Sequence, residues 1–116
     1  MVVDDCERNK PWRDRVAAFA INYKPDQLLT DALHLHVDFI MPRPKGHFGT
    51  GKNAAKLKPS APKFHTKRPD ATKLLRALED ALTGVIWRDD EQIVKQTVRK
   101  HYGQSPGAIV TIREIV

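Results

Sequence analysis

The chain has 116 residues and a formal net charge of +6 at neutral pH, from 20 Lys and Arg against 14 Asp and Glu. This length suits one domain with one core, and we expect residues 1–116 to form it. The positive charge favours a polyanionic partner, with nucleic acid as the first candidate. Cys6 is the single cysteine, which excludes a disulfide framework and a CxxC metal site. No apolar run reaches the ~18 residues that span a bilayer and no signal peptide is evident, so we expect a cytoplasmic protein without a membrane partner.

Two periodic segments open the chain. Residues 10–23 carry apolar side chains at helical spacing and end near Pro25, which predicts an amphipathic helix. Residues 33–41 alternate between apolar and polar side chains instead, which predicts a strand with one buried face. The apolar side comprises Leu33, Leu35, Val37, Phe39 and Met41, and the polar side comprises His34, His36 and Asp38.

A second helix is predicted after Asp70, with Asp70 or Thr72 as its N-cap and Gly84 as its stop. Its apolar stripe comprises Leu74, Leu75, Leu78, Ala81 and Leu82. Residues 92–100 and 108–116 are extended in pattern, and the HYGQSPG segment between them predicts a hairpin connection. The order of elements predicts an α/β (α+β) fold, in which two helices pack on a mixed sheet of three to four strands.

The connection over residues 42–69 is basic, contains no acid, and is rich in Pro and Gly. Such a long connection in a small domain is usually functional or disordered. We interpret it as an arm that contacts DNA phosphates, with aromatic side chains able to stack on bases. A solvated basic linker is the alternative that composition leaves open. The basic residues of the arm are Arg43, Lys45, Lys52, Lys56, Lys58, Lys63, Lys67 and Arg68.

Within this arm, residues 46–53 read GHFGTGKN and match the GxxxxGK part of a phosphate-binding P-loop. A nucleotide site also needs Ser or Thr at the next position, where Asn53 stands. It needs a long helix as well, which Pro59 prevents. We therefore expect no nucleotide cofactor and interpret the glycines as a hinge in the arm.

The polar side of the first strand brings His34, His36 and Asp38 together at every second position. This spacing can place three metal ligands side by side, as in a metal-dependent hydrolase or oxygenase. Any half-exposed strand shows the same polar period, however, and we favour that explanation.

Carboxylates stand at both ends of the second helix, with Asp70 before it and Asp89 and Asp90 in the turn after it. If these acids converge, they can hold a divalent cation and form a hydrolytic site. A helix cap and a solvated turn provide the alternative.

The same segment resembles the RusA-type Holliday junction resolvases, a family of crossover junction endodeoxyribonucleases. The resemblance lies in Pro69-Asp70, in Leu74-Leu75-Arg76, in EDALTG at residues 79–84 and in WRDDEQIV at residues 87–94. It extends more loosely to Trp12-Arg13, to the strand after Ala32 and to Pro44-Lys45-Gly46, and so covers most of the chain.

The resemblance implies a homodimeric, Mg²⁺-dependent endonuclease with a RusA-like fold. Such an enzyme binds branched DNA and resolves four-way junctions by paired symmetric nicks in recombination and repair. Matched position by position, the catalytic residues fall on Asp70, Asp90, Arg76 and Lys73, and the metal ligands on Asp70, Asp90 and Asp89. Thr72 and Lys73 replace an acid and an asparagine of the family pattern. The strand that opens the family fold has no counterpart in the pattern of the nine residues before Lys10.

A non-catalytic DNA-binding or architectural module is the main alternative, because the same basic arm serves it and the acids then cap a helix and a turn. Dependence on metal distinguishes the two.

Overall fold

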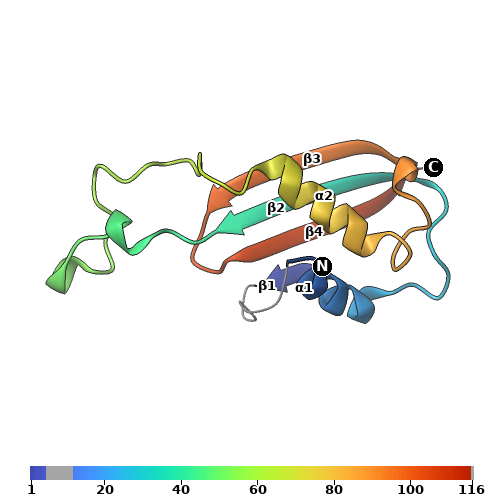
Figure 1. The fold of residues 1–116 in the computed structure, drawn as a ribbon, viewed down its shortest axis with the longest axis horizontal. Helices are drawn as coiled ribbons and strands as arrows, with labels where there is room; N and C mark the ends of the chain where they lie inside the picture. Colours follow the sequence, from blue (N-terminus) through green and yellow to red (C-terminus); the bar gives the residue numbers. More distant parts are fainter. Residues whose placement is uncertain (5–11, 116) are drawn as a thin grey trace.

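The computed structural model describes residues 1–4 and 12–115 (Figure 1). Two helices and a four-stranded mixed sheet confirm the expected α+β class. The elements are β1 (Val2–Asp4), α1 (Trp12–Ala20), β2 (Ala32–Met41), α2 (Ala71–Leu82), β3 (Ile93–Tyr102) and β4 (Gly107–Ile115). Short 3-10 turns stand at Ile21–Tyr23, Lys45–His47, Gly51–Asn53 and Asp90–Gln92.

The strands lie in the order β1-β4-β2-β3. The central strand β2 runs parallel to β3 and antiparallel to β4, and β1 pairs antiparallel with β4. Leu33, Leu35, Val37 and Phe39 of β2 are all buried, which confirms the predicted apolar side of this strand.

The hairpin predicted between the last two strands is wrong, because β2 lies between β3 and β4. The connecting turn passes across the end of β2, where the Gly103 amide donates to the Met41 carbonyl oxygen at 3.1 Å. A strand whose inner face is fully apolar buries the most apolar surface at the centre of a sheet, where it has a neighbouring strand on each side. The Gly and Pro residues of the turn correctly predicted that the chain reverses direction. They did not predict that β3 and β4 each pair with β2 and not with each other.

The structure also corrects the expectation that no leading strand exists. Val2–Asp4 form β1, and Val3 is fully buried against the sheet. A strand of three residues is too short to show the alternation from which strands are predicted.

Both helices agree with their predicted spans to within a few residues. The first was expected to begin at Lys10, which lies outside the described residues, and its regular part ends at Ala20 before a 3-10 turn to Tyr23. In α2, Leu78, Ala81 and Leu82 are buried, and Leu74 and Leu75 pack against them. Gly84 follows with φ +84°, a left-handed conformation that glycine adopts without strain and that ends the helix.

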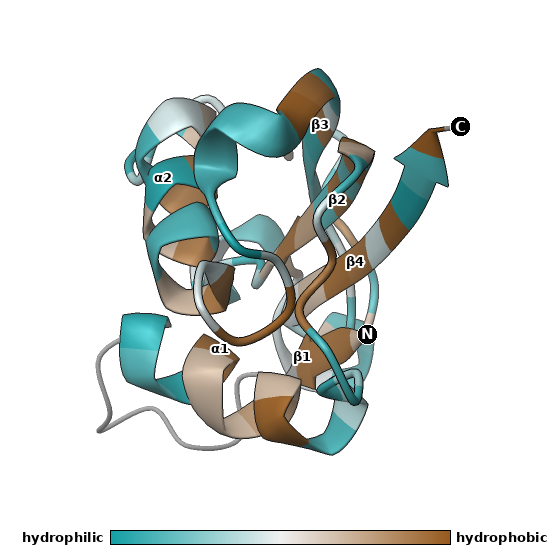
Figure 2. Ribbon diagram, turned by 90° about the vertical axis from the view of Figure 1, so that its right-hand side faces the viewer, coloured by the Kyte–Doolittle hydropathy of each residue, from teal (hydrophilic) through white to brown (hydrophobic). Residues whose placement is uncertain are grey.

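The two helices cover one face of the sheet, and their apolar sides point toward it (Figure 2). The core between the helices and the sheet includes Trp87, Phe39 and Leu78, all fully or almost fully buried. The basic arm leaves this body at the end of β2 and projects beyond the sheet (Figure 1). No helix within residues 1–4 and 12–115 is long and apolar enough to cross a membrane.

Candidate functional site

Asp70 occupies the N-cap position of α2, but its side chain makes no capping hydrogen bond. The backbone carbonyl of Asp70 accepts from the Leu74 amide at 3.2 Å, so the helix begins without help from the carboxylate. That carboxylate is 57% exposed, and its Oδ1 lies 3.9 Å from the Lys73 ammonium. Its oxygens therefore face solvent and can bind a cation.

Lys100 of β3 fixes the chain just before Asp70. Its ammonium donates to the carbonyl oxygen of Lys67 at 2.9 Å and to that of Pro69 at 3.0 Å. The positive end of the α2 dipole adds to the charges of Lys100, Lys73 and the neighbouring Arg68. Asp70 thus stands at an electropositive position that suits a phosphate group beside a bound cation.

The exposed face of α2 continues from this point. Thr72, Lys73 and Arg76 are all exposed, and the last two share a helix face at i and i+3. Asp80, one turn beyond Arg76, pairs with Arg13 of α1 at 3.1 Å. Thr72 lies in the first turn of the helix, close to Asp70 in the chain.

The turn after α2 is tightly built. The indole nitrogen of buried Trp87 donates to the Thr83 hydroxyl at 3.0 Å, and the Gly84 amide donates to the Trp87 carbonyl at 2.7 Å. The Gln92 side chain donates to the carbonyl oxygens of Leu29 at 2.9 Å and of Asp31 at 3.0 Å. These contacts fix the position of the aspartate pair relative to the start of β2.

The two aspartates of this pair have different environments. The carboxylate of Asp89 accepts from the Glu91 amide at 3.0 Å, and the Asp89 amide donates to the Gln92 side chain at 2.7 Å, forming a capping box. The hydrogen bond from the Glu91 amide is the main reason why the pKa of Asp89 is lowered. Asp90 is the first residue of the turn that Asp89 caps, and its side chain is exposed.

Glu79 joins the acids at this end of α2, and sequence reasoning had given it no role. It accepts a hydrogen bond from the Gln96 side chain of β3. Burial raises the pKa of Glu79, and the charges of Asp90 and Asp80 add to this rise, against the lowering effect of the Gln96 bond. Only the packing of α2 on β3 brings Glu79 and Asp90 together, so no local sequence signal could have found the pair.

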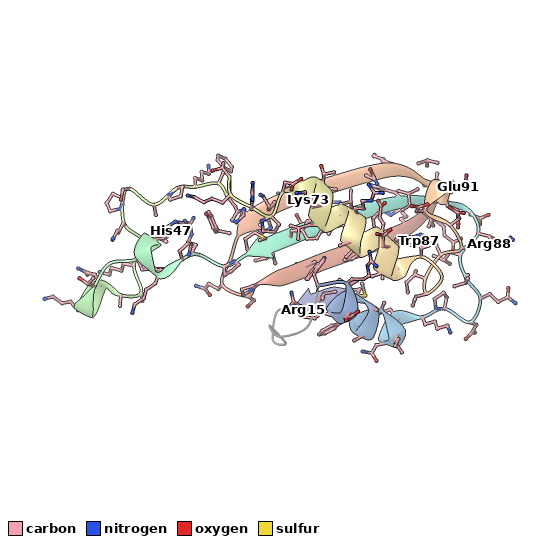
Figure 3. The ribbon with its side chains drawn as sticks, in the orientation of Figure 1. Arg15, His47, Lys73, Trp87, Arg88 and Glu91 are labelled. Atoms are coloured by element: carbon pink, nitrogen blue, oxygen red, sulfur yellow. The ribbon has the colours of Figure 1, made fainter. Side chains whose placement is uncertain are left out.

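Asp70 and Asp90 of the same chain lie at opposite ends of α2. Asp70 precedes α2 and Asp90 follows it, and a helix of 12 residues is about 18 Å long. Figure 3 shows the same separation, with Lys73 at one end of α2 and Glu91 beyond the other. Among residues 1–4 and 12–115, no three His, Cys, Asp or Glu side chains lie close enough together to hold a metal ion.

The basic arm is anchored at its base by an aromatic cluster. The guanidinium of Arg43 lies 4.2 Å from the centre of the Tyr102 ring and donates to the Pro62 carbonyl at 2.7 Å. The rings of His47 and His65 meet that of Tyr102 at 5.4 and 5.2 Å. Arg43 is therefore partly buried between Tyr102 of β3 and the arm, whereas the other seven basic residues of the arm are exposed.

The segment that matches the P-loop does not continue into a helix. Residues 51–53 form a single 3-10 turn, and α2 begins only at Ala71. The Gly49 amide donates to the Lys56 carbonyl at 2.9 Å, so this segment folds back on itself instead of opening into a helix.

The three polar residues of β2 engage in other contacts. His34 shares a hydrogen bond of 2.9 Å with Thr97, and Asp38 pairs with Arg99 at 3.1 Å and with His36 at 3.5 Å. These residues form no metal-binding group in the described part of the chain. The metal site considered for them is not supported.

A small α+β protein that presents exposed carboxylates beside a basic arm has the features of a protein that processes nucleic acid. A family model described as "Endodeoxyribonuclease RusA" matches residues 3–113. The chain is also 30% identical over 111 residues to the "Uncharacterized protein YqaN" of Bacillus subtilis (strain 168), covering 96% of this chain and 78% of that protein. The chain belongs to the RusA endodeoxyribonuclease family. Membership implies Holliday junction resolvase endonuclease activity on branched DNA.

Proposed function

We propose that this chain is a homodimeric, Mg²⁺-dependent nuclease that resolves four-way DNA junctions by paired symmetric nicks in recombination and repair. Residues 1–116 act as one nuclease domain, and residues 42–69 form its DNA-contacting arm. The proposal rests on one observation in a chain of this family: the carboxylate of Asp70 is exposed, makes no capping hydrogen bond and lies among cationic groups. A DNA substrate of this kind would place the protein in the cytoplasm.

The chemistry of the acids fits Mg²⁺, which takes oxygen ligands and is usually held by one or two carboxylates together with water and a substrate phosphate. Asp70 and Asp90 are the proposed ligands. Asp89, the further ligand that the resemblance implies, already accepts from the Glu91 amide, so its proposed role is to hold the turn in place beside the other two acids. When bound, the ion supplies charge stabilisation at the phosphate and lowers the pKa of a coordinated water.

Lys73 and Arg76 are the proposed phosphate-binding residues of the site. Both are exposed on α2 within about two turns of Asp70. Their charges can balance the negative charge that develops on a phosphate during cleavage. Arginine also presents a fork of donors that matches two phosphate oxygens.

The separation of Asp70 from Asp90 along α2 supports a site shared between two protomers. In a twofold dimer with antiparallel α2 helices, Asp70 of one protomer would lie beside Asp90 of the partner subunit. The twofold axis would create two such sites. In the described sheet β3 is an edge strand beside α2, with β2 as its neighbour, so its open edge can pair with a second copy. Two equivalent sites suit two symmetric nicks.

The exposed basic residues of the arm are the proposed contacts to the DNA backbone. They are Lys45, Lys52, Lys56, Lys58, Lys63, Lys67 and Arg68, with Arg43 anchoring the arm at its base. Neutralising about six phosphates would weaken binding about a thousandfold between 50 and 200 mM salt.

The decisive experiment incubates the purified protein with a synthetic four-way junction, with and without Mg²⁺, beside an unbranched duplex of matched length. We expect paired nicks in the junction only when Mg²⁺ is present, and little cleavage of the duplex. Junction binding without cleavage at any Mg²⁺ concentration would favour the non-catalytic DNA-binding module. The observation in favour of that second function is Thr72, which replaces an acid next to Asp70.

A further inference from the structure

The face of the sheet opposite the helices carries a polar surface that the proposed nuclease site does not use. Within the described chain, both helices lie on the other face (Figure 2). The exposed face belongs to the outward residues of β2, β3 and β4. We call this surface the open face, and its polar members are His34, His36, Asp38, Lys95, Thr97, Arg99, His101, Thr111 and Arg113.

Strand register arranges the open face in rows. Lys95 of β3 and Arg113 of β4 both pair with His34 of β2, so three basic side chains form one row across the sheet. Thr97 and Thr111 flank His36 in the next row. Neighbouring strands lie about 4.8 Å apart, so each row is about 10 Å wide.

The first row is cationic and has no carboxylate of its own. Among the described residues neither Lys95 nor Arg113 forms an ion pair. Asp38, the acid of the open face, is already paired with Arg99 at 3.1 Å. A shallow groove of about 210 Å³ runs past the row and is lined by His34, His36, Asp38, Thr111 and Arg113.

His34 reports the same positive environment. Burial lowers the pKa of His34, and the charges of Lys95 and Arg113 and the neighbouring His36 lower it further. Like charges placed in one row repel each other, and an anion bound among them would relieve the repulsion. Thr97 already shares a hydrogen bond of 2.9 Å with His34, whereas the Thr111 hydroxyl of the next row can donate to the same anion.

We propose that the open face binds the sugar–phosphate backbone of a DNA duplex arm, with a phosphate seated between Lys95, His34 and Arg113. The proposal rests on the proposed function, because it takes branched DNA as the ligand, and it adds a second contact surface to the arm at residues 42–69. Polyanion and surface are complementary in charge. A second copy of the chain fits less well, because a twofold contact through this row would bring identical cations together.

Apolar side chains mark where the DNA contact ends. Val2 and Ile109, which are 54% and 40% exposed, pair across β1 and β4 beside the polar rows. A phosphate gains little from apolar neighbours, so the DNA contact lies at the end of the open face formed by Lys95, His34 and Arg113, away from Ile109.

The test measures binding of a four-way junction and of a matched duplex, without divalent metal, over a series of salt concentrations. Lys95→Gln and Arg113→Gln are compared with Lys24→Gln, which removes one exposed lysine from the helix layer and leaves the open face intact. A fourth variant, Lys56→Gln, probes the arm. Circular dichroism melting verifies that every variant is folded.

We expect each open-face variant to bind about five to ten times more weakly at 0.1 M salt and to reduce the salt slope by about 0.9, the value for one lost phosphate contact. Lys24→Gln should stay within about twofold of the unaltered protein. If Lys56→Gln weakens binding while both open-face variants match Lys24→Gln, the inference is wrong and the proposed function stands. Failure of the unaltered protein to bind either DNA would overturn both. A change of oligomeric state in Arg113→Gln with unchanged DNA affinity would show a protein interface instead.

Discussion

The Lys100 ammonium lies 3.0 Å from the carbonyl oxygen of Pro69, the residue before Asp70, and so connects the end of β3 to the start of α2. Together with its bond to the Lys67 carbonyl at 2.9 Å, this contact sets where the basic arm ends and the candidate site begins. Lys100 holds the backbone in place without touching the carboxylate.

Replacing Lys100 with Met removes both bonds and keeps most of the length of the unbranched side chain. We expect a loss of about 1 kcal/mol in stability, a fall of about 5 °C in Tm, and slower junction cleavage. Lys24→Met serves as the control, and thermal melting and nicking rates are the measurements. Cleavage at the normal rate in a destabilised Lys100→Met protein would mean that the contact supports the fold but not the site.

Asp70→Asn and Asp90→Asn should each reduce Mg²⁺-dependent nicking at least about a hundredfold while junction binding persists, since each removes a carboxylate ligand without changing shape. A heterodimer that combines one chain of each kind tests the shared site. In that heterodimer one site keeps both acids and the other loses both. We therefore expect about half the normal nicking rate, with one strand cut instead of two. If the heterodimer is as inactive as either mutant homodimer, both acids act within one chain.

Substitutions should separate the roles of the two neighbouring aspartates. Asp89→Ala removes the acceptor of the Glu91 amide and should lower Tm by a few degrees, whereas Asp89→Asn retains an acceptor and should melt near the normal temperature. Asp90→Ala should leave Tm almost unchanged and abolish nicking. Equal effects of both alanine variants on nicking, at equal stability, would assign a direct role to Asp89 as well.

Thr72 offers a gain-of-function test. A carboxylate there lies in the first turn of α2, beside Asp70, where the helix dipole favours negative charge. We expect Thr72→Asp to lower the Mg²⁺ concentration needed for half-maximal nicking by about tenfold, because it adds an oxygen ligand of opposite charge to the ion. Thr72→Asn has the same shape without the charge and is the matched control. An unchanged Mg²⁺ requirement in Thr72→Asp would place Thr72 outside the metal's reach.

The raised pKa of Glu79 predicts a pH dependence of stability. Because the folded protein binds this proton more tightly than the unfolded chain, the contribution of Glu79 to stability is full below the ordinary pKa of 4.5 and is lost as pH rises through the folded value. Glu79→Gln stays neutral and can still accept from Gln96. Its Tm should therefore exceed that of the unaltered protein at pH 7 and match it at pH 4. A constant difference between the two pH values would contradict the assignment.

The predicted and observed structures agree where the hydrophobic periodicity extends over many residues, and they differ where an element is too short to show it. The ten-residue alternation of β2 and the apolar stripe of α2 predicted the buried side of each element, because burial acts on every second or every third to fourth residue. The three residues of β1 are too few to show such a period. The hairpin prediction was wrong because turn residues indicate only that the chain reverses direction. The order of the strands depends instead on which strand has the most apolar surface to bury.

The sequence alone determined the α+β class, the exposed basic arm, and the segment at residues 69–94 that carries the family resemblance. Each of these depends on residues that are close together in the chain. Tertiary structure decided that Asp89 is a cap, that Glu79 lies near Asp90, that Lys100 fixes the start of α2, and that Asp70 and Asp90 lie about a helix length apart. The reason is physical: hydrophobic periodicity specifies which side of an element is buried, but contacts between elements arise from how those buried sides pack together.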